Sequence, residues 1–173
     1  RLALMPERRL APLADPIDRS QTFSTELWSA VRELELFGLP FPAAVGGADG
    51  TFLAFIVATE EVAQSCTVAA LYPGTTVQVA TALLENASEE LIAACVPRLV
   101  RGEALAAWAF TEPQTGSDPR QLETCATRVD GGWLLRGQKL FISFAGQAAE
   151  AHVFARTGDG SVGAFLVDTA DPG

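Results

Sequence analysis

Hydrophobic residues recur at helical spacing in the first hundred positions. The segment 24–37 has apolar side chains on one helical face, at Leu27, Trp28, Val31 and Leu34. This spacing predicts an amphipathic helix. Ser24 is a candidate N-cap, and Gly38 lies where a helix C-terminus accepts a left-handed residue.

Three further helices are predicted before position 105. The segment 51–64 is apolar on nearly all sides, which favours a place in the middle of a bundle. Another helix is expected over 75–84, after Tyr72-Pro73-Gly74 interrupts the pattern. The last begins at Ser88, where two glutamates complement the helix dipole, and ends within 98–102. Short connections favour an antiparallel bundle.

After Glu103 the pattern changes to short apolar segments separated by turn residues. Strands are predicted over 104–110, 124–129, 133–135, 139–143, 152–156 and 162–167. Asp130-Gly131-Gly132 is a hairpin signal. The predicted fold class is therefore α+β. An antiparallel helical bundle over 1–105 is followed, over 106–173, by an incomplete domain with a partial antiparallel sheet or barrel.

Composition narrows the possible functions of this 173-residue chain. Its net charge is −9 without a basic stripe, which argues against nucleic-acid binding because phosphate contacts dominate that affinity. No uninterrupted apolar run reaches the roughly 18 residues of a membrane span, and no secretory signal is visible. Three distant cysteines and a single histidine favour neither a disulfide framework nor a metal site. A reducing, cytoplasmic location is expected.

The polar segment 110–118, Phe-Thr-Glu-Pro-Gln-Thr-Gly-Ser-Asp, directly follows an apolar run. Pro113 fixes one backbone angle, Gly116 permits unusual ones, and Ser117 and Asp118 can bond nearby amides. Such a loop can direct several N–H groups towards one anion. From composition alone an ordinary surface turn is the stronger interpretation.

Several motifs in order resemble the acyl-CoA dehydrogenase family. They are Thr-Glu-Pro-x-x-Gly-Ser-Asp at 111–118, the Asp-Gly hairpin, Gly-x-Lys-x-x-Ile-Ser at 137–143 and Ala-Arg-Thr at 155–157. Two earlier segments, 38–47 and 59–63, are similar to that family's helical domain. The resemblance covers essentially the whole chain. It implies an N-terminal helical domain and the first part of the middle β domain, with the family's C-terminal helical domain absent.

The resemblance also implies a role in FAD binding for seven residues: Trp108, Phe110, Thr111, Gly116, Ser117, Phe141 and Ser143. Phe110 and Thr111 would lie against the pyrimidine edge of the flavin, walled by Trp108. Gly116 and Ser117 would approach the pyrophosphate, and Ser117 would also lie near the acyl-CoA substrate. Phe141, where the family commonly has Trp, would cover one ring face. The Ser143 hydroxyl would lie near flavin N5.

The family's members oxidise acyl-CoA thioesters at the α,β carbons and pass electrons to electron-transfer flavoprotein or a similar acceptor. The resemblance therefore implies a fragment or truncated form of such an enzyme, inactive alone, with its catalytic base outside this chain. A homo-oligomer or a partner subunit is expected. The alternatives are a non-catalytic binding or assembly subunit, an acyl-CoA oxidase, and a flavin monooxygenase on the same fold. The acyl pocket is expected around 68–84.

Three other polar features have ordinary explanations. Glu60 and Glu61 are neighbours on a predicted helix and point in different directions, so a solvated face is favoured over acid/base catalysis. Lys139, the only lysine, is expected to be structural and to pair with an acidic neighbour. His152 alternates with apolar residues in a strand and is expected to be a structural or rim histidine.

Overall fold

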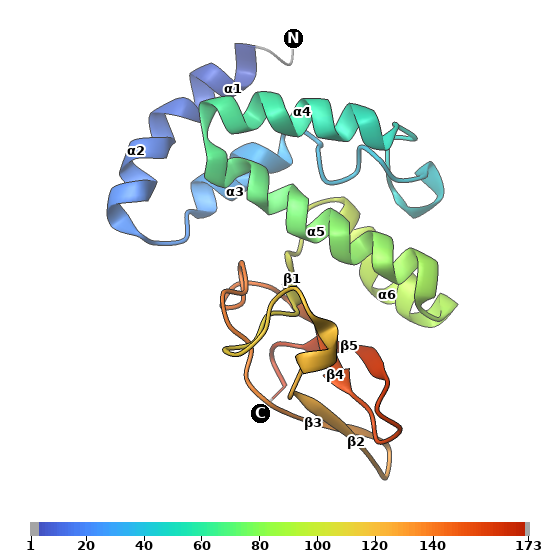
Figure 1. Cartoon of the computed structure of the whole chain (residues 1–173). Coiled ribbons are helices and arrows are strands. Elements are labelled where there is room, and N and C mark those ends of the chain that lie inside the picture. The colour runs from blue at the N-terminus through green and yellow to red at the C-terminus, as the bar shows by residue number, and fades with distance from the viewer. Residues whose placement is uncertain (1–3, 172–173) are drawn as a thin grey trace. The chain divides into compact units, whose positions relative to one another are not determined.

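The structure is a computed structural model that describes residues 4–171 (Figure 1). The chain forms two compact units, one ending at Ala104 and the other beginning at Leu105. In the described residues the first unit has six α-helices: α1 Leu4–Arg9, α2 Ala11–Ser20, α3 Thr25–Arg32, α4 Phe52–Ser65, α5 Thr67–Asn86 and α6 Glu89–Val100. The chain reverses direction from α4 to α5 and again from α5 to α6 (Figure 1). Helix α5 packs against both of these neighbours.

The predicted starts of three helices are confirmed by side-chain caps. The Ser24 hydroxyl accepts a hydrogen bond from the Leu27 amide at 3.1 Å. Thr51 caps α4 through the Ala54 amide at 3.1 Å. At α6, Ser88 accepts from the amide of Leu91. Each cap satisfies an N–H group that has no partner within its own helix.

Helix α3 ends earlier than the apolar spacing predicts. It stops at Arg32, and the chain then turns through Glu35, whose φ of 55° is left-handed. Gly38, expected in that conformation, does not have a positive φ. Space explains the glycine instead, since a Cβ there would lie 3.1 Å from the carbonyl oxygen of Val100.

Helix α5 runs straight through the Tyr72-Pro73-Gly74 sequence, so the predicted interruption is wrong. Tyr72 is fully buried, and its hydroxyl donates to the Ser24 carbonyl oxygen at 3.2 Å. Burial of this face outweighs the hydrogen bond that Pro73 removes. By length and composition alone α5 could cross a membrane, but 44% of the relevant window is buried inside the protein. The core helix of a soluble protein passes the same test, so the length and composition of α5 are weak evidence for a membrane span.

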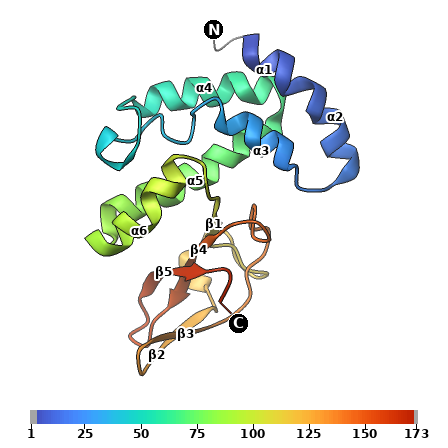
Figure 2. The same ribbon diagram turned by 180° about the vertical axis from the view of Figure 1, so that it is seen from behind.

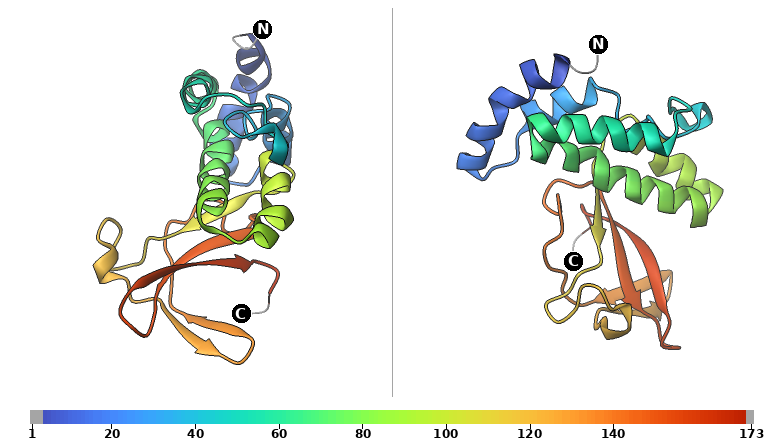
Figure 3. Two further views of the ribbon diagram at one scale, coloured as in Figure 1. Left: turned by 90° about the vertical axis from the view of Figure 1, so that its right-hand side faces the viewer. Right: turned by 45° about the horizontal axis from the view of Figure 1, so that its top comes forward.

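Helix α4 does not take the central place predicted for it. Phe55 and Val62 are buried, whereas four apolar side chains are exposed: Phe52, Leu53, Ile56 and Val57. Figure 3 shows α4 lying alongside α5 within the helical unit. The apolar character of α4 therefore predicts more burial than this unit provides.

The second unit contains a five-stranded mixed sheet (Figure 2). Its strands are β1 Ala106–Ala109, β2 Cys125–Val129, β3 Gly132–Arg136, β4 Glu150–Arg156 and β5 Val162–Asp168. The pairs β2–β3 and β4–β5 are antiparallel, as predicted. Strand β4, however, pairs in parallel with β1 and, at one position, with β2. The expectation of a purely antiparallel sheet is therefore corrected.

The predicted strand over 139–143 is also wrong. This segment is irregular and passes into a turn at Ser143. Phe141 has a φ of 57°, which no regular strand accommodates. Its polar groups bind the loop over 111–118, here called the Thr-Glu-Pro loop, instead of a neighbouring strand.

Candidate flavin site

The Thr-Glu-Pro loop is a tight, internally bonded turn. The amide of Glu112 donates to the Thr115 carbonyl oxygen at 2.8 Å, and the reverse bond spans 3.2 Å. The Thr115 hydroxyl then donates to the carbonyl oxygen of Asp118 at 2.9 Å. Asp118 in turn caps the short 3-10 helix Pro119–Gln121. These bonds fix the path of the chain on both sides of Gly116 and Ser117.

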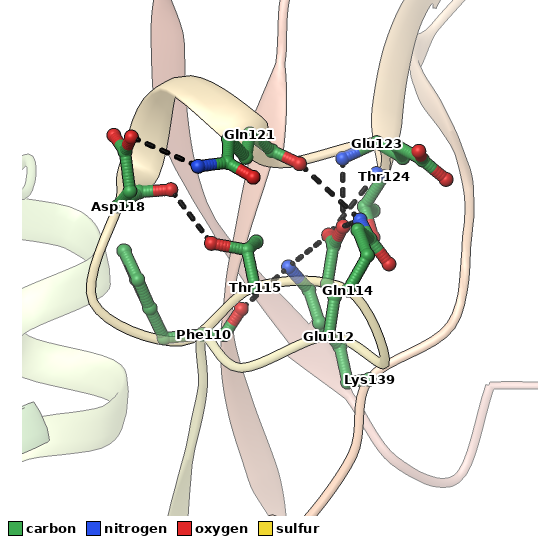
Figure 4. Close-up of polar contacts among 9 residues, drawn as sticks. All are labelled: Phe110, Glu112, Gln114, Thr115, Asp118, Gln121, Glu123, Thr124 and Lys139. Carbon is green, nitrogen blue, oxygen red and sulfur yellow. Dashed lines mark hydrogen bonds and ion pairs between the residues drawn. The ribbon is translucent and has the colours of Figure 1, made fainter.

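Glu112 lies at the centre of this arrangement (Figure 4). Its side chain is buried, and its carboxylate accepts hydrogen bonds from the amides of Glu123 at 2.6 Å and Thr124 at 3.0 Å. Gln114 donates a further bond at 2.6 Å. Burial alone would raise the pKa of Glu112, but Lys139 and these amides favour the charged form and lower it to about 2.

Lys139 joins the second motif to the first. Its ammonium group lies 2.7 Å from Glu112 Oε1 and 3.1 Å from the Phe110 carbonyl oxygen. The next amide, that of Leu140, donates to the Thr111 carbonyl oxygen at 2.9 Å. The expectation that Lys139 pairs with an acidic neighbour is confirmed. Two segments that are distant in the sequence therefore lie side by side (Figure 4).

Phe141 directly follows the junction that Lys139 and Leu140 form with residues 110–112. Its side chain is 87% exposed, and its left-handed backbone is one that a bulky residue rarely adopts. Phe144 also has a positive φ, of 60°. Ser143, between them, is exposed. A strained and exposed aromatic residue beside a functional motif is typical of a ligand-binding segment.

Trp108 and Phe110 belong to an aromatic cluster on one face of the sheet. The Trp108 ring stacks on His152 with 5.1 Å between centroids and 2° between planes. Phe154 lies 4.8 Å from Trp108 and 5.1 Å from Phe110. His152 is therefore buried in the cluster, at 8% exposure, and not at its rim.

The Leu140 amide bonds to the Thr111 carbonyl oxygen, and Phe141 is the residue that follows Leu140 in the chain; Ser143 lies two residues beyond Phe141. Gly116 is close to Thr111 as well, because a Cβ on it would lie 3.8 Å from the Thr111 methyl group. Ser117 is exposed one residue further on. Trp108 lies in β1, and Phe110 lies between the end of that strand and Thr111. All seven predicted residues thus belong to two adjoining loops and the strand before them.

Three residues around the site have no role in the sequence-based prediction: Glu112, Phe154 and Thr124. Of these, only Glu112 could have been predicted from the sequence, because it is a carboxylate within the turn motif and the chain has a single lysine that needs an acidic partner. The others are identified only by the long-range pairing of strands.

The side chains present fit a flavin cofactor such as FAD, which carries an isoalloxazine ring and a pyrophosphate. Among residues 4–171, the hydroxyls of Ser117 and Ser143 make no hydrogen bond to another protein group, and both residues are exposed. Phe141 offers a free aromatic face. Hydroxyl donors and an aromatic ring to stack on are groups that a flavin cofactor requires in its site.

Comparison with known proteins identifies the family. Residues 5–103 match the N-terminal domain of acyl-CoA dehydrogenases, and residues 107–173 match the middle domain of the same family. The chain therefore belongs to the acyl-CoA dehydrogenase family, a family of flavoprotein oxidoreductases.

Relatives of known function support this membership. Benzylmalonyl-CoA dehydrogenase of Aromatoleum aromaticum is 34% identical, over 96% of this chain and 45% of its own length. The caffeyl-CoA reductase–Etf complex subunit CarC of Acetobacterium woodii is 30% identical, over 93% and 44%. Among solved structures, a glutaryl-CoA dehydrogenase of Mycobacterium smegmatis in complex with FADH2 superimposes with a TM-score of 0.91 at 27% identity. That match covers 99% of this chain and 45% of the solved chain. The chain thus spans about half the length of these relatives.

Proposed function

We propose that this chain supplies the flavin-facing half of an FAD-dependent acyl-CoA dehydrogenase. The observation that carries the proposal is the junction in which Leu140 and Lys139 bond to Thr111, Phe110 and Glu112. It supports a site in which the segment that begins with Thr111 and the segment that contains Phe141 and Ser143 share one ligand. The solved relative that contains FADH2 supports the choice of cofactor.

In this proposal the chain's residues bind and orient the cofactor, and a bound flavin would supply the hydride acceptor for the substrate. Thr111 and Ser143 direct hydroxyls at the ring edge, and Phe141 covers one face. Gly116 and Ser117 hold the phosphates, with Ser117 also close to the acyl-CoA. Donors in fixed positions stabilise the electron-rich reduced ring without reorganisation.

The proposed reaction, α,β-dehydrogenation of an acyl-CoA thioester, also needs a carboxylate that removes the α-proton. Neither carboxylate of the Thr-Glu-Pro loop suits this role. Glu112 is buried and bonded to Lys139. Asp118 is engaged by Arg120, Gln121 and the Arg120 amide, and these bonds lower its pKa to about 2. A base should have a pKa near the working pH, so we place the base outside this chain and expect the chain alone to be inactive.

We further propose that electrons leave to an electron-transfer flavoprotein or a similar acceptor. The support is the name of one relative, a subunit of a complex that contains Etf. An assembly with a second subunit would supply the remainder of the FAD site.

The test compares the 173-residue chain with a chimera that joins it to the remaining half of the 34%-identical relative. We expect the chain to bind FAD weakly and to show no bleaching of flavin absorbance by acyl-CoA. The chimera should bleach anaerobically. Ser143→Ala should weaken FAD binding by roughly 2- to 12-fold, the loss of one neutral hydrogen bond. Ser29→Ala, in the helical unit, serves as the control.

Bleaching by the chain alone would overturn the claim that it is inactive. Failure of both proteins to bind FAD would overturn the assignment. Oxygen consumption with peroxide formation would point to an oxidase on the same fold.

A further inference from the structure

His152 is placed against Trp108 by the pairing of strands. The two residues are register partners in the parallel pair β1–β4, and their rings are stacked and nearly parallel, with 2° between their planes. Phe154 closes the same cluster, with its ring 5.1 Å from His152. The plane of Trp108 is therefore set by an imidazole on one side.

The protonation state of that imidazole decides whether it can remain where it is. Within residues 4–171, His152 Nδ1 is buried and has no hydrogen-bond partner. A neutral ring tolerates this, because Nε2 carries the proton and Nδ1 is only an unused acceptor. A protonated ring would place a donor at Nδ1 with no acceptor, which is costly in a buried position. Burial accordingly lowers the pKa of His152.

The surrounding charged groups do not supply that acceptor. On the same face of β4 lie Glu150 and Arg156, and on β5 Asp168 is the register partner of Glu150. Leu166 is opposite His152 itself. On β2, Cys125 is opposite Arg156, and β1 has no titratable residue. None of these groups in the described chain bonds to His152 Nδ1.

We propose that His152 is a positioning residue of the flavin site, holding the Trp108 plane while neutral and releasing it when protonated. The inference rests on the proposed function, in which Trp108 walls the flavin. Acidification then weakens flavin binding through a residue that does not touch the flavin. Attraction between an imidazolium and the indole face acts in the opposite direction, and the experiment decides between the two.

The first experiment needs no flavin. In a Trp28→Phe/Trp133→Phe variant, Trp108 is the only tryptophan, and its fluorescence is followed from pH 8 to pH 5. We expect one step with a midpoint below 6.5, the ordinary value for histidine. Adding His152→Phe, which keeps a ring that stacks but does not titrate, should remove the step. A midpoint at or above 6.5, no step, or a step that survives His152→Phe would overturn the proposal.

The second experiment measures FAD affinity over the same range. We expect affinity of the wild-type chain to fall below the midpoint by up to about tenfold per pH unit, the limit for one linked proton. The His152→Phe chain should lack this dependence. Equal pH dependence in both proteins would overturn the role of His152 while leaving the proposed function intact. Absence of FAD binding in both at every pH would overturn the proposed function, and the fluorescence step would still report on His152.

Discussion

Glu112 and Lys139 are 27 residues apart in the sequence and form an ion pair of 2.7 Å. Their side chains are only 2% and 12% exposed. The pair joins the loop that contains Thr111 to the loop that contains Phe141 and Ser143. It is the main polar connection between the two halves of the candidate flavin site.

Removing the lysine should destabilise the second unit. Lys139→Met leaves the Glu112 carboxylate buried beside amides but without its counter-charge, a change that typically costs roughly 3–5 kcal/mol. Urea unfolding is followed by the fluorescence of Trp108 and Trp133 in a Trp28→Phe background. Arg136→Met, an exposed position on β3, should change stability by less than about 0.5 kcal/mol. Equal effects of the two substitutions would contradict the importance of the pair.

The same pair predicts acid sensitivity. The pKa of Glu112 falls from 4.5 to about 2 on folding, so its contribution to stability is full above pH 4.5. That contribution is lost as the pH decreases from 4.5 towards 2. Glu112→Gln should therefore unfold with a weaker pH dependence over this range. The surface carboxylates of Asp118 and Asp159, whose pKa values are also about 2, are present in both proteins. Parallel pH profiles would show that Glu112 is not paired.

Gly137 lies just before the segment 139–143 and is packed closely against Thr124. A Cβ there would lie 2.6 Å from Thr124 Cα and would also clash with the Thr124 hydroxyl oxygen. Gly137→Ala should destabilise the second unit by about 1–3 kcal/mol, because backbone must move. Gly146→Ala meets no atom within 4 Å and should be nearly neutral. Thermal unfolding of the two variants provides the comparison, and a neutral Gly137→Ala would contradict the close approach.

Phe141 should show opposite effects on stability and on binding. Glycine relieves its left-handed backbone, whose penalty is about 1–2 kcal/mol, and little buried area is lost at 87% exposure. Phe141→Gly should leave stability unchanged or raise it by up to about 1 kcal/mol, while FAD affinity falls. Phe141→Trp should retain binding, since it keeps a ring that stacks. Marked destabilisation by glycine would mean that the ring is part of the core.

Local signals in the sequence predicted local structure well. The hydroxyl cap at Ser24, the helix starts at Thr51 and Ser88, and the β2–β3 hairpin depend on near neighbours and are confirmed. Pro73 misled the prediction because burial of Tyr72 on the same helix outweighs the local preference of proline.

Long-range pairing accounts for the other errors. Nothing near β1 shows that it pairs in parallel with β4, 44 residues further on at the Trp108–His152 pair. The apolar pattern of 139–143 is that of a strand, yet its polar groups bond to Thr111 and Glu112. The assignment of residues to the flavin site stays a prediction. The sequence predicts an acidic partner for Lys139 but not that this partner is Glu112, and it does not predict the stack of Trp108 on His152.

The most direct test of the flavin site is a two-dimensional amide NMR titration of the 18.3 kDa chain with FAD. We expect shifts to concentrate at residues 108–117 and 140–143, with amides of α4 and α6 nearly unchanged. Saturable shifts confined to other residues, with the amides of Thr111 and Ser143 unaffected, would contradict it.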